Sequence, residues 1–153
     1  MRAPGRLIAV LLLGLSTLGC GKSGFVKPRG KVIKAGQPYC TPEGEGLRIF
    51  LSPIDAQSKG YDSYAAEYNQ DDGSFRVVGK DGNGLPPGKY HVSLQLMKSK
   101  EDLLNNKLLG KGSPLTCEVT SAGDDLVIDL DQANFDALLA QAAAPAKRKG
   151  PHR

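Results

Sequence analysis

The most regular segment of this 153-residue chain reads Lys89-Tyr90-His91-Val92-Ser93-Leu94-Gln95-Leu96-Met97. From Tyr90 to Leu96 the apolar side chains occupy every second position, and polar side chains stand between them. Successive side chains of a β-strand point to opposite faces, so this alternation predicts a strand with one buried face. Hydrophobic residues make up 40% of the chain, which is enough to pack a core at this length.

Similar patterns predict six further strands, at residues 25–34, 46–52, 61–69, 74–78, 115–119 and 126–130. Turn residues separate them, they recur about every 10–15 residues, and no alternation of strands with helices occurs. The segment 61–69 also fits a helical face, and we favour a strand because a turn and another strand follow immediately. The sequence therefore predicts an all-β fold, an antiparallel β-sandwich of about seven strands.

Two segments do not follow the strand pattern. Residues 100–109 predict a short helix or an extended insertion whose leucines are available to cover a sheet edge: Leu103, Leu104, Leu108 and Leu109. Residues 131–144 predict a short C-terminal helix, capped by Asp131 and ended by Pro145. Its apolar side chains form one stripe that can dock on the sheet: Phe135, Leu138, Leu139 and Ala142.

The start of the chain is typical of an export signal. Arg2 and Arg6 give it positive charge, and residues 7–18 form a mostly apolar run of 12 residues. A run of this length is too short to span a bilayer, which takes about 20 apolar residues.

The segment Thr17-Leu18-Gly19-Cys20 resembles the lipobox of bacterial lipoproteins, although Thr17 stands where that pattern prefers Leu. The resemblance implies that Cys20 carries acyl chains such as palmitate and becomes the mature N-terminus. Two or three chains are enough for stable anchoring. The alternative is an ordinary signal peptide with an accidental cysteine. Gly21 is not the acidic residue that retains some lipoproteins at the inner membrane, which slightly favours the outer membrane.

We therefore expect five parts along the chain. They are a signal peptide (1–19), a lipidated cysteine with its tether (20–24), a β-sandwich domain (25–130), a C-terminal helix (131–144) and a basic tail (145–153). Removal of the signal peptide lowers the net charge from +4 to +2. This small charge and the expected export exclude nucleic acid as a partner.

Two cysteines remain once Cys20 carries lipid. Cys40 lies in a turn-rich stretch and Cys117 in a predicted strand. An even number of cysteines in an oxidising compartment predicts a Cys40–Cys117 disulfide, and two free thiols are the alternative. Nothing near them resembles a redox-active Cys-x-x-Cys motif.

Three segments together resemble the small bacterial lipoproteins that carry a carboxypeptidase-regulatory-like domain. They are Gly30-Lys31-Val32 with Ala35-Gly36-Gln37-Pro38, then Asp72-Gly73-Ser74-Phe75, then Leu85-Pro86-Pro87-Gly88-Lys89-Tyr90-His91-Val92. The resemblance covers about residues 26–130 and implies a transthyretin-like (prealbumin-like) β-sandwich. It implies a scaffold more than an activity.

The residues of these motifs have structural roles. Gly73 allows the positive φ of a hairpin turn, and Phe75 fills the core at the start of the next strand. Pro87 and Gly88 suit the centre of a type II turn. Tyr90 is expected to enter the core with its hydroxyl at the rim, where backbone can pair with it.

The sequence supports no catalytic site. His91 lies on the expected outer face of a strand and His152 in the tail, so neither a catalytic triad nor a zinc site is supported, and no cofactor is expected. Of the metals, calcium suits the sequence best, because two nearby loops offer four oxygen ligands: Asp71, Asp72, Asp81 and Asn83. Turns favour these same residues, so we expect no metal.

We therefore expect a non-enzymatic, membrane-anchored envelope lipoprotein with a structural or protein-interaction role. The alternative is a module that binds polysaccharide or a small ligand, with Tyr61, Tyr64 and Tyr68 as a stacking row. Core or cross-strand packing is the plainer explanation of these tyrosines. The partners expected are the lipid membrane, through Cys20, and an unknown envelope protein or glycan.

Overall fold

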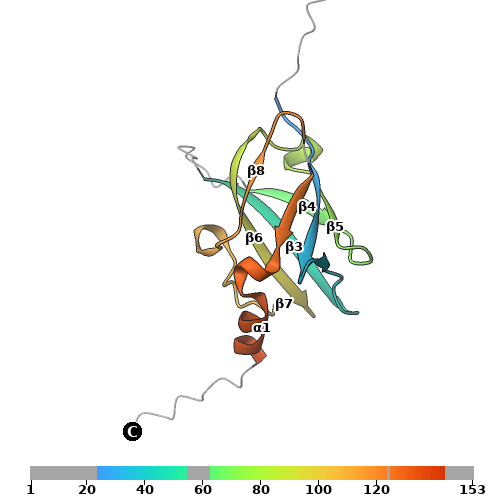
Figure 1. Cartoon of the computed structure of the whole chain (residues 1–153), viewed down its shortest axis with the longest axis vertical. Helices are drawn as coiled ribbons and strands as arrows, with labels where there is room; N and C mark the ends of the chain where they lie inside the picture. The colour runs from blue at the N-terminus through green and yellow to red at the C-terminus, as the bar shows by residue number, and fades with distance from the viewer. Residues whose placement is uncertain (1–23, 55–62, 124, 144–153) are drawn as a thin grey trace, which may run out of the picture.

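The computed structural model describes residues 24–54, 63–123 and 125–143. They form a curled sheet with one short helix at the end of the chain (Figure 1). The strands are β1 (Arg29–Lys34), β2 (Gln37–Pro38), β3 (Glu45–Pro53), β4 (Tyr64–Tyr68), β5 (Ser74–Val77), β6 (Gly88–Lys98), β7 (Glu101–Asp102), β8 (Thr116–Val119) and β9 (Leu126–Asp129). The helix is α1 (Phe135–Ala143), and three 3₁₀ turns are η1 (Lys80–Gly82), η2 (Gly110–Gly112) and η3 (Leu130–Ala133). The predicted all-β fold with a short C-terminal helix is confirmed.

The main strands lie in the order β9–β1–β5–β4–β3–β6–β8, while β2 pairs with β1 and β7 with β6. Every pairing is antiparallel except that of β1 with β9, which is parallel. The parallel pair differs from the expected antiparallel sheet. The sheet curls until β8 and β9 approach each other without forming a ladder, and β9 pairs with the first strand instead. Alternation within a strand carries no information about its partner.

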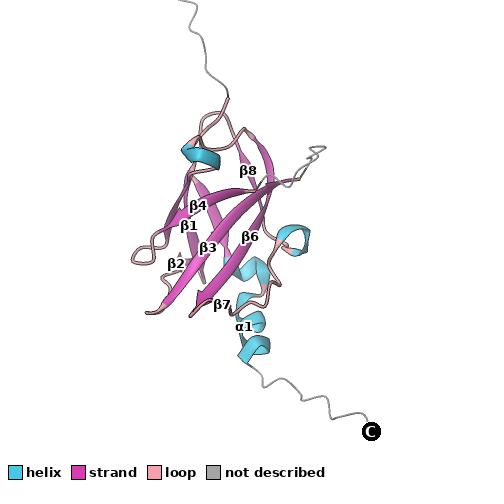
Figure 2. Ribbon diagram, turned by 180° about the vertical axis from the view of Figure 1, so that it is seen from behind, coloured by secondary structure: helices cyan, strands magenta, loops and turns pink. Residues whose placement is uncertain are grey.

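The longest ladder joins β3 and β6, from the pair Glu45–Lys98 to the pair Pro53–Tyr90 (Figure 2). Apolar side chains of the two strands face each other across it, at Leu47 and Leu96, Ile49 and Leu94, and Leu51 and Val92. All six are buried. The segment 89–97 therefore forms the central strand that its alternation predicts.

Tyr90 enters the core as expected, because its side chain is only 2% exposed. Its hydroxyl donates to the carbonyl oxygen of Pro86 at 2.5 Å. A tyrosine bonded to backbone a few residues upstream also closes corners in Greek-key sandwiches. Gly88 has a φ of +157°, far from the value near +80° of a type II turn, and it already begins β6. The predicted type II turn at Pro87-Gly88 is wrong.

The turn before β5 agrees with the sequence. Gly73 has a φ of +70°, and a Cβ there would lie 2.8 Å from the carbonyl oxygen of Tyr39. Phe75 follows in β5 and is 3% exposed. Glycine is therefore required both by the backbone angle and by the close approach of the chain.

Residues 99–115 form neither a helix nor a regular strand pair beyond β7. They take the place of a strand along the edge of β6, since the amides of Val92 and Leu94 donate to the carbonyl oxygens of Leu115 and Leu108. Leu104 is also buried beneath this loop. Of the two alternatives for this segment, the insertion that covers an edge is confirmed.

One carboxylate organises that loop. Asp102 Oδ1 accepts from the amides of Leu96 at 3.1 Å and Leu104 at 3.0 Å, and Oδ2 accepts from the amide of Asn106 at 2.9 Å. Asn106 and its neighbour Asn105 have positive φ, a region that asparagine tolerates. The side chain thus stands in for the backbone acceptors that a neighbouring strand would supply.

The C-terminal helix begins later than expected. Residues 130–133 form η3, Asn134 has left-handed backbone angles, and α1 starts at Phe135. Asp131 does not cap a helix, because its carboxylate accepts from the amide of Ala35 at 2.8 Å. Phe135 is buried and packs edge-on against Tyr39, with ring centres 5.5 Å apart, so the apolar stripe docks the helix on the sheet.

Candidate functional site

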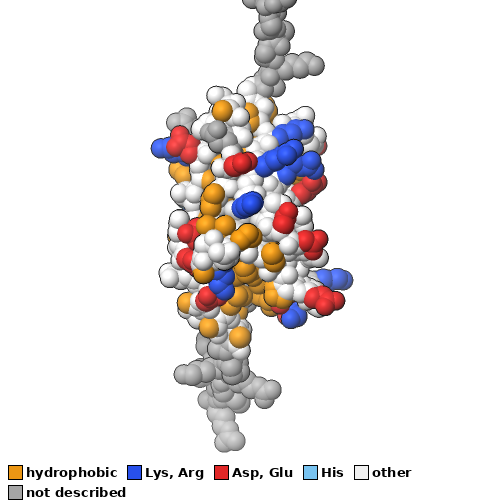
Figure 3. All heavy atoms as spheres, turned by 45° about the vertical axis from the view of Figure 1, so that its right-hand side comes forward, with side chains coloured by type: hydrophobic (Ala, Val, Ile, Leu, Met, Phe, Trp, Pro, Cys, Tyr) orange, Lys and Arg blue, Asp and Glu red, His pale blue; other side chains and the backbone are white. Residues whose placement is uncertain are grey.

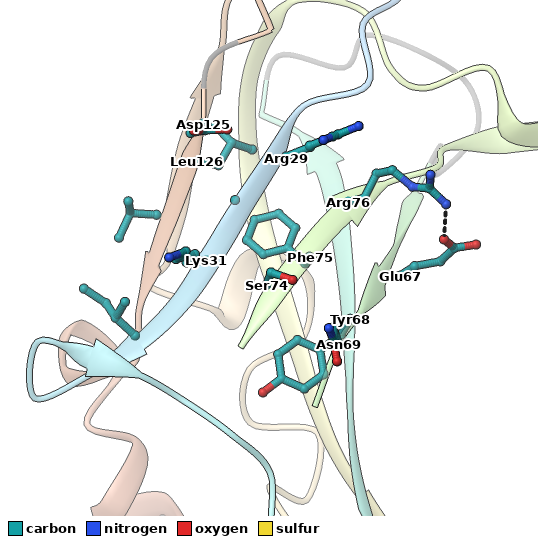
Figure 4. A pocket seen from close by; sticks show the side chains of 13 residues that line it. Arg29, Lys31, Glu67, Tyr68, Asn69, Ser74, Phe75, Arg76, Asp125 and Leu126 are labelled. Carbon is teal, nitrogen blue, oxygen red and sulfur yellow. Dashed lines mark hydrogen bonds and ion pairs between the residues drawn. The ribbon is translucent and has the colours of Figure 1, made fainter. Parts of the chain in front are cut away.

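A broad, open depression of about 830 Å³ is lined by residues of β9, β1, β5 and β4 (Figure 4). Strand alternation creates it. Gly30 and Val32 of β1 point inward, so Arg29, Lys31 and Ile33 point outward. We call the surface formed by Arg29, Lys31, Ile33 and Val127 the cationic face.

The charges of this face are unevenly matched. Arg76 of β5 pairs with Glu67 of β4 at 2.6 Å, and both side chains are more than half exposed. Arg29 and Lys31 form no ion pair with any other residue that the structure describes. Asp125 lies beside them at the start of β9 (Figure 4). Both cations are exposed and form no ion pair within the described part of the chain, although Lys31 lies near enough to Asp72 to lower the pKa of that carboxyl.

An apolar side chain lies next to these cations. Val127 of β9 is 60% exposed, the largest exposed fraction among the exposed large hydrophobic residues described. It is the register partner of Lys31 in the parallel pair, and half-buried Ile33 follows on the same side of β1. Figure 3 brings the β1 and β5 side forward and shows basic side chains gathered beside a band of hydrophobic ones. The face thus combines charge with apolar area.

The floor of the depression depends on a close approach of three strands. A Cβ on Gly30 would lie 2.3 Å from the carbonyl oxygen of Leu126 and 2.6 Å from the ring of Phe75. Only a glycine lets β1 pass between β9 and the buried Phe75 ring. This site was not predicted from the sequence. Its signal was present, as Arg29, Lys31 and Val127 occupy the outward positions of their strands.

The expected tyrosine row does not form. Tyr64 and Tyr68 of β4 are half-buried and pack against the core. The Tyr64 ring stands edge-on to that of Tyr90, with centres 6.0 Å apart, and the Tyr68 hydroxyl donates to the carbonyl oxygen of Tyr39. The stacking row is wrong for these two residues, because the Tyr64 ring packs in the core and Tyr68 is the one described tyrosine that lines the depression. Tyr61 lies outside the described residues.

Burial changes the acidity of these phenols. Loss of hydration raises the pKa of Tyr68 above its usual value, and the nearby Cys40 adds to the effect. Burial likewise raises the pKa of Tyr90 to about 12. Both hydroxyls therefore stay protonated and act as hydrogen-bond donors to backbone at neutral pH.

The predicted disulfide is also wrong, because Cys40 and Cys117 are free. Cys117 is the register partner of Tyr90, which faces Pro53 at the far end of the β3–β6 ladder. Cys40 is exposed, lies near Glu45 at the opposite end of that ladder, and donates its thiol to the carbonyl oxygen of Asp71 at 3.3 Å. The two sulfurs are thus at opposite ends of the fold. Burial raises the pKa of Cys117 to about 11.

The polar loop residues considered as calcium ligands form hydrogen bonds with backbone or occupy turns. Asp72 accepts from the amide of Ser74 at 2.8 Å, and hydrogen bonds from Ser74 lower the pKa of this carboxyl. The amide of Asp71 donates to Asn69 Oδ1 at 3.0 Å. Asp81 has a φ of +54° inside η1. Among the described residues no three His, Cys, Asp or Glu side chains gather as a metal site.

His91 points to the outer side of β6, as its place in the alternation predicts, and it is half-buried. Its Nδ1 atom is enclosed and has no hydrogen-bond partner. No carboxylate bonds to this imidazole in the part of the chain that the structure describes, so no triad is assembled there.

Cys20 and the basic tail lie outside the described residues. No helix within 24–54, 63–123 and 125–143 is long and apolar enough to cross a bilayer. Comparisons with protein-family models, with curated proteins and with solved structures returned no match. The resemblance to carboxypeptidase-regulatory-like lipoproteins therefore stays a prediction.

Proposed function

We propose that the chain is a bacterial envelope lipoprotein, held by acylated Cys20, whose β-sheet domain binds an acidic protein through the cationic face. Its role is non-enzymatic. The carrying observation is that Arg29 and Lys31 lie without ion-pair partners among the described residues, beside the exposed Val127. Carboxylates of the partner would form ion pairs with Arg29 and Lys31, and the contact would bury the exposed Val127 side chain.

The shape of the site favours a protein over a small ligand. The depression of about 830 Å³ is broad and open, whereas small-molecule sites are enclosed and mostly apolar. A glycan-stacking row is not formed, because Tyr64 packs against the core and Tyr68 is the one tyrosine of the described chain that lines the depression. Arginine beside apolar area is also the composition enriched where proteins bind one another.

The anchor is tested by the intact mass of the chain purified from membranes of the producing bacterium. We expect a chain that begins at Cys20 and carries the added mass of acyl groups. A chain that retains Met1, with Cys20 unmodified, would contradict the proposed location.

The cationic face is tested in intact cells by photo-crosslinking. Val127 is replaced by p-benzoylphenylalanine, and we expect an adduct with one defined protein. The double variant Arg29→Glu, Lys31→Glu should lower the adduct by about tenfold or more. The matched control Lys107→Glu, Lys111→Glu makes the same change of charge on the loop beside β6 and should leave it unchanged. An adduct that is insensitive to charge reversal at Arg29 and Lys31, or one with glycan alone, would refute the proposal.

A further inference from the structure

The described chain starts at one end of the curled sheet, and α1 lies at the other end (Figure 1). Segment 24–28 is held firmly to that first end. The amide of Val26 donates to the carbonyl oxygen of Leu85 at 2.8 Å, and the amide of Leu85 donates back to Val26 at 2.9 Å. The chain therefore leaves the fold at a defined place.

The side chain at that place is an exposed aromatic ring. Phe25 is 47% exposed, and it is the only aromatic among the large hydrophobic residues that are exposed in the described chain. Its neighbour Val26 packs against the core. The hydrogen bonds of Val26 thus present the Phe25 ring at the surface in a fixed position.

Two lysines lie at the same end of the domain as this ring. Lys27 is exposed, and its side chain lies against Gly84. Lys80 is exposed at the start of η1, which a bridge between Gly79 and Gly84 holds at the same end (Figure 1). Asp81 is the acidic neighbour in η1, so the basic character of this end is modest.

We infer that this end of the domain, formed by Phe25, Lys27 and Lys80, rests on the bilayer surface with the Phe25 ring in the headgroup region. This inference rests on the proposed anchor at Cys20. Four residues lie between Cys20 and Phe25, which are therefore five Cα–Cα steps apart. Even fully extended they span at most about 17 Å, so an acylated Cys20 keeps Phe25 close to the headgroups. Aromatic rings favour this interface, and lysines near it attract anionic headgroups.

The contact would set the orientation of the molecule. With this end on the membrane, α1 lies at the end away from the bilayer, and β1 and β9, which carry the cationic face, run between the two ends (Figure 1). A partner could then reach Arg29 and Val127 without displacing lipid. The membrane contact and the cationic face are separate surfaces and can be tested separately.

The test uses the tryptophan-free composition of the chain. The variant Phe25→Trp, expressed as the full chain and purified with its acyl groups, is reconstituted into vesicles that contain brominated lipids. We expect a blue shift and strong quenching of its emission. The control Ala140→Trp, on an exposed position of α1 at the far end, should emit as in water and stay unquenched.

Charge supplies a second measurement. Adding Lys27→Glu and Lys80→Glu to Phe25→Trp should weaken the quenching in vesicles that contain phosphatidylglycerol, and much less in phosphatidylcholine vesicles. Equal quenching with and without these changes would overturn the role of the lysines.

The outcomes separate this inference from the anchor on which it rests. An acylated chain that floats with vesicles while Phe25→Trp stays unquenched overturns the membrane contact and leaves the anchor intact. A chain without acyl mass at Cys20 overturns the anchor itself, and with it the membrane contact.

Discussion

The β6 side and the β9 side of the curled sheet differ in how far other parts of the chain cover them. Along β6, the loop of residues 99–115 supplies backbone and carboxylate partners, and it buries Leu104 and Leu108. At β9 the sheet ends in a short strand whose outward Val127 is exposed beside Lys31. On the β6 side the loop residues stabilise the fold, whereas on the β9 side charged and apolar side chains stay exposed. A surface that the fold does not need for its own core is the one free to bind.

The largest effect is expected where β9 and β1 approach most closely. Gly30→Ala places a Cβ against the Leu126 carbonyl and the Phe75 ring, so we expect the free energy of unfolding to fall by about 3 kcal/mol. Gly46→Ala in β3 is the matched control, because nothing lies within 4 Å of its added Cβ. That control should be neutral or raise stability by up to about 1 kcal/mol. Urea unfolding of both variants measures the contrast, and equal stabilities would contradict the close approach.

The loop-covered side should depend on Asp102. Asp102→Ala removes the acceptor of three backbone amides, and we expect a loss of about 2 kcal/mol with faster hydrogen exchange at Leu96 and Leu104. The same change at exposed Asp125, on the open side, should stay within about 0.5 kcal/mol. If Asp125→Ala costs as much as Asp102→Ala, the two sides do not differ as described.

Alkaline pH tests the contribution of Tyr90, near the start of β6, to stability. The pKa of Tyr90 is about 12 in the folded protein, against the ordinary value of 10.0 that holds in the unfolded chain. The contribution of the protonated Tyr90 side chain to the free energy of unfolding is therefore complete below pH 10 and is lost as the pH rises toward 12. Tyr90→Phe should cost about 1 kcal/mol at pH 7 and flatten the fall of stability between pH 10 and 12. Unfolding curves across this range measure both, and an unchanged pH profile would contradict the burial of the Tyr90 hydroxyl.

The smallest effect is expected from reducing agents. A Cys40–Cys117 bridge would span the fold, and its loss would cost roughly 4 kcal/mol. Because both thiols are free, the melting temperature should be the same with and without reductant. Alkylation of the native protein should modify exposed Cys40 first and half-buried Cys117 only on unfolding. A melting temperature that falls with reductant would show that the Cys40–Cys117 disulfide forms after all.

The strands were the predictable part of this fold. Segments 46–52, 74–78 and 89–97 alternate clearly, and each became a strand close to those bounds. Alternation is a local property that the pleat of one strand imposes, so it can be read without knowing the neighbours. The edge-covering role of residues 99–115 was predictable for a similar reason, since its leucines had no other place to be buried.

The candidate site was not predicted, because it depends on which face of each strand turns outward. Tyr64 and Tyr68 share one face of β4 by their spacing, but only the curl of the sheet placed that face against the core. The parallel pairing of β1 with β9 then brought Lys31 beside Val127, residues far apart along the chain. Asp131 illustrates the same limit, as its acceptor oxygens serve Ala35 rather than the helix.

By itself, the sequence determined the all-β class, the positions of the main strands and the short helix, because these follow from backbone geometry and the pattern of apolar residues within a few neighbours. Only the tertiary structure decided the order of the strands, the separation of the two cysteines and the exposure of the cationic face. Those features depend on contacts between distant segments, and many pairings satisfy the same local pattern until the whole core is packed.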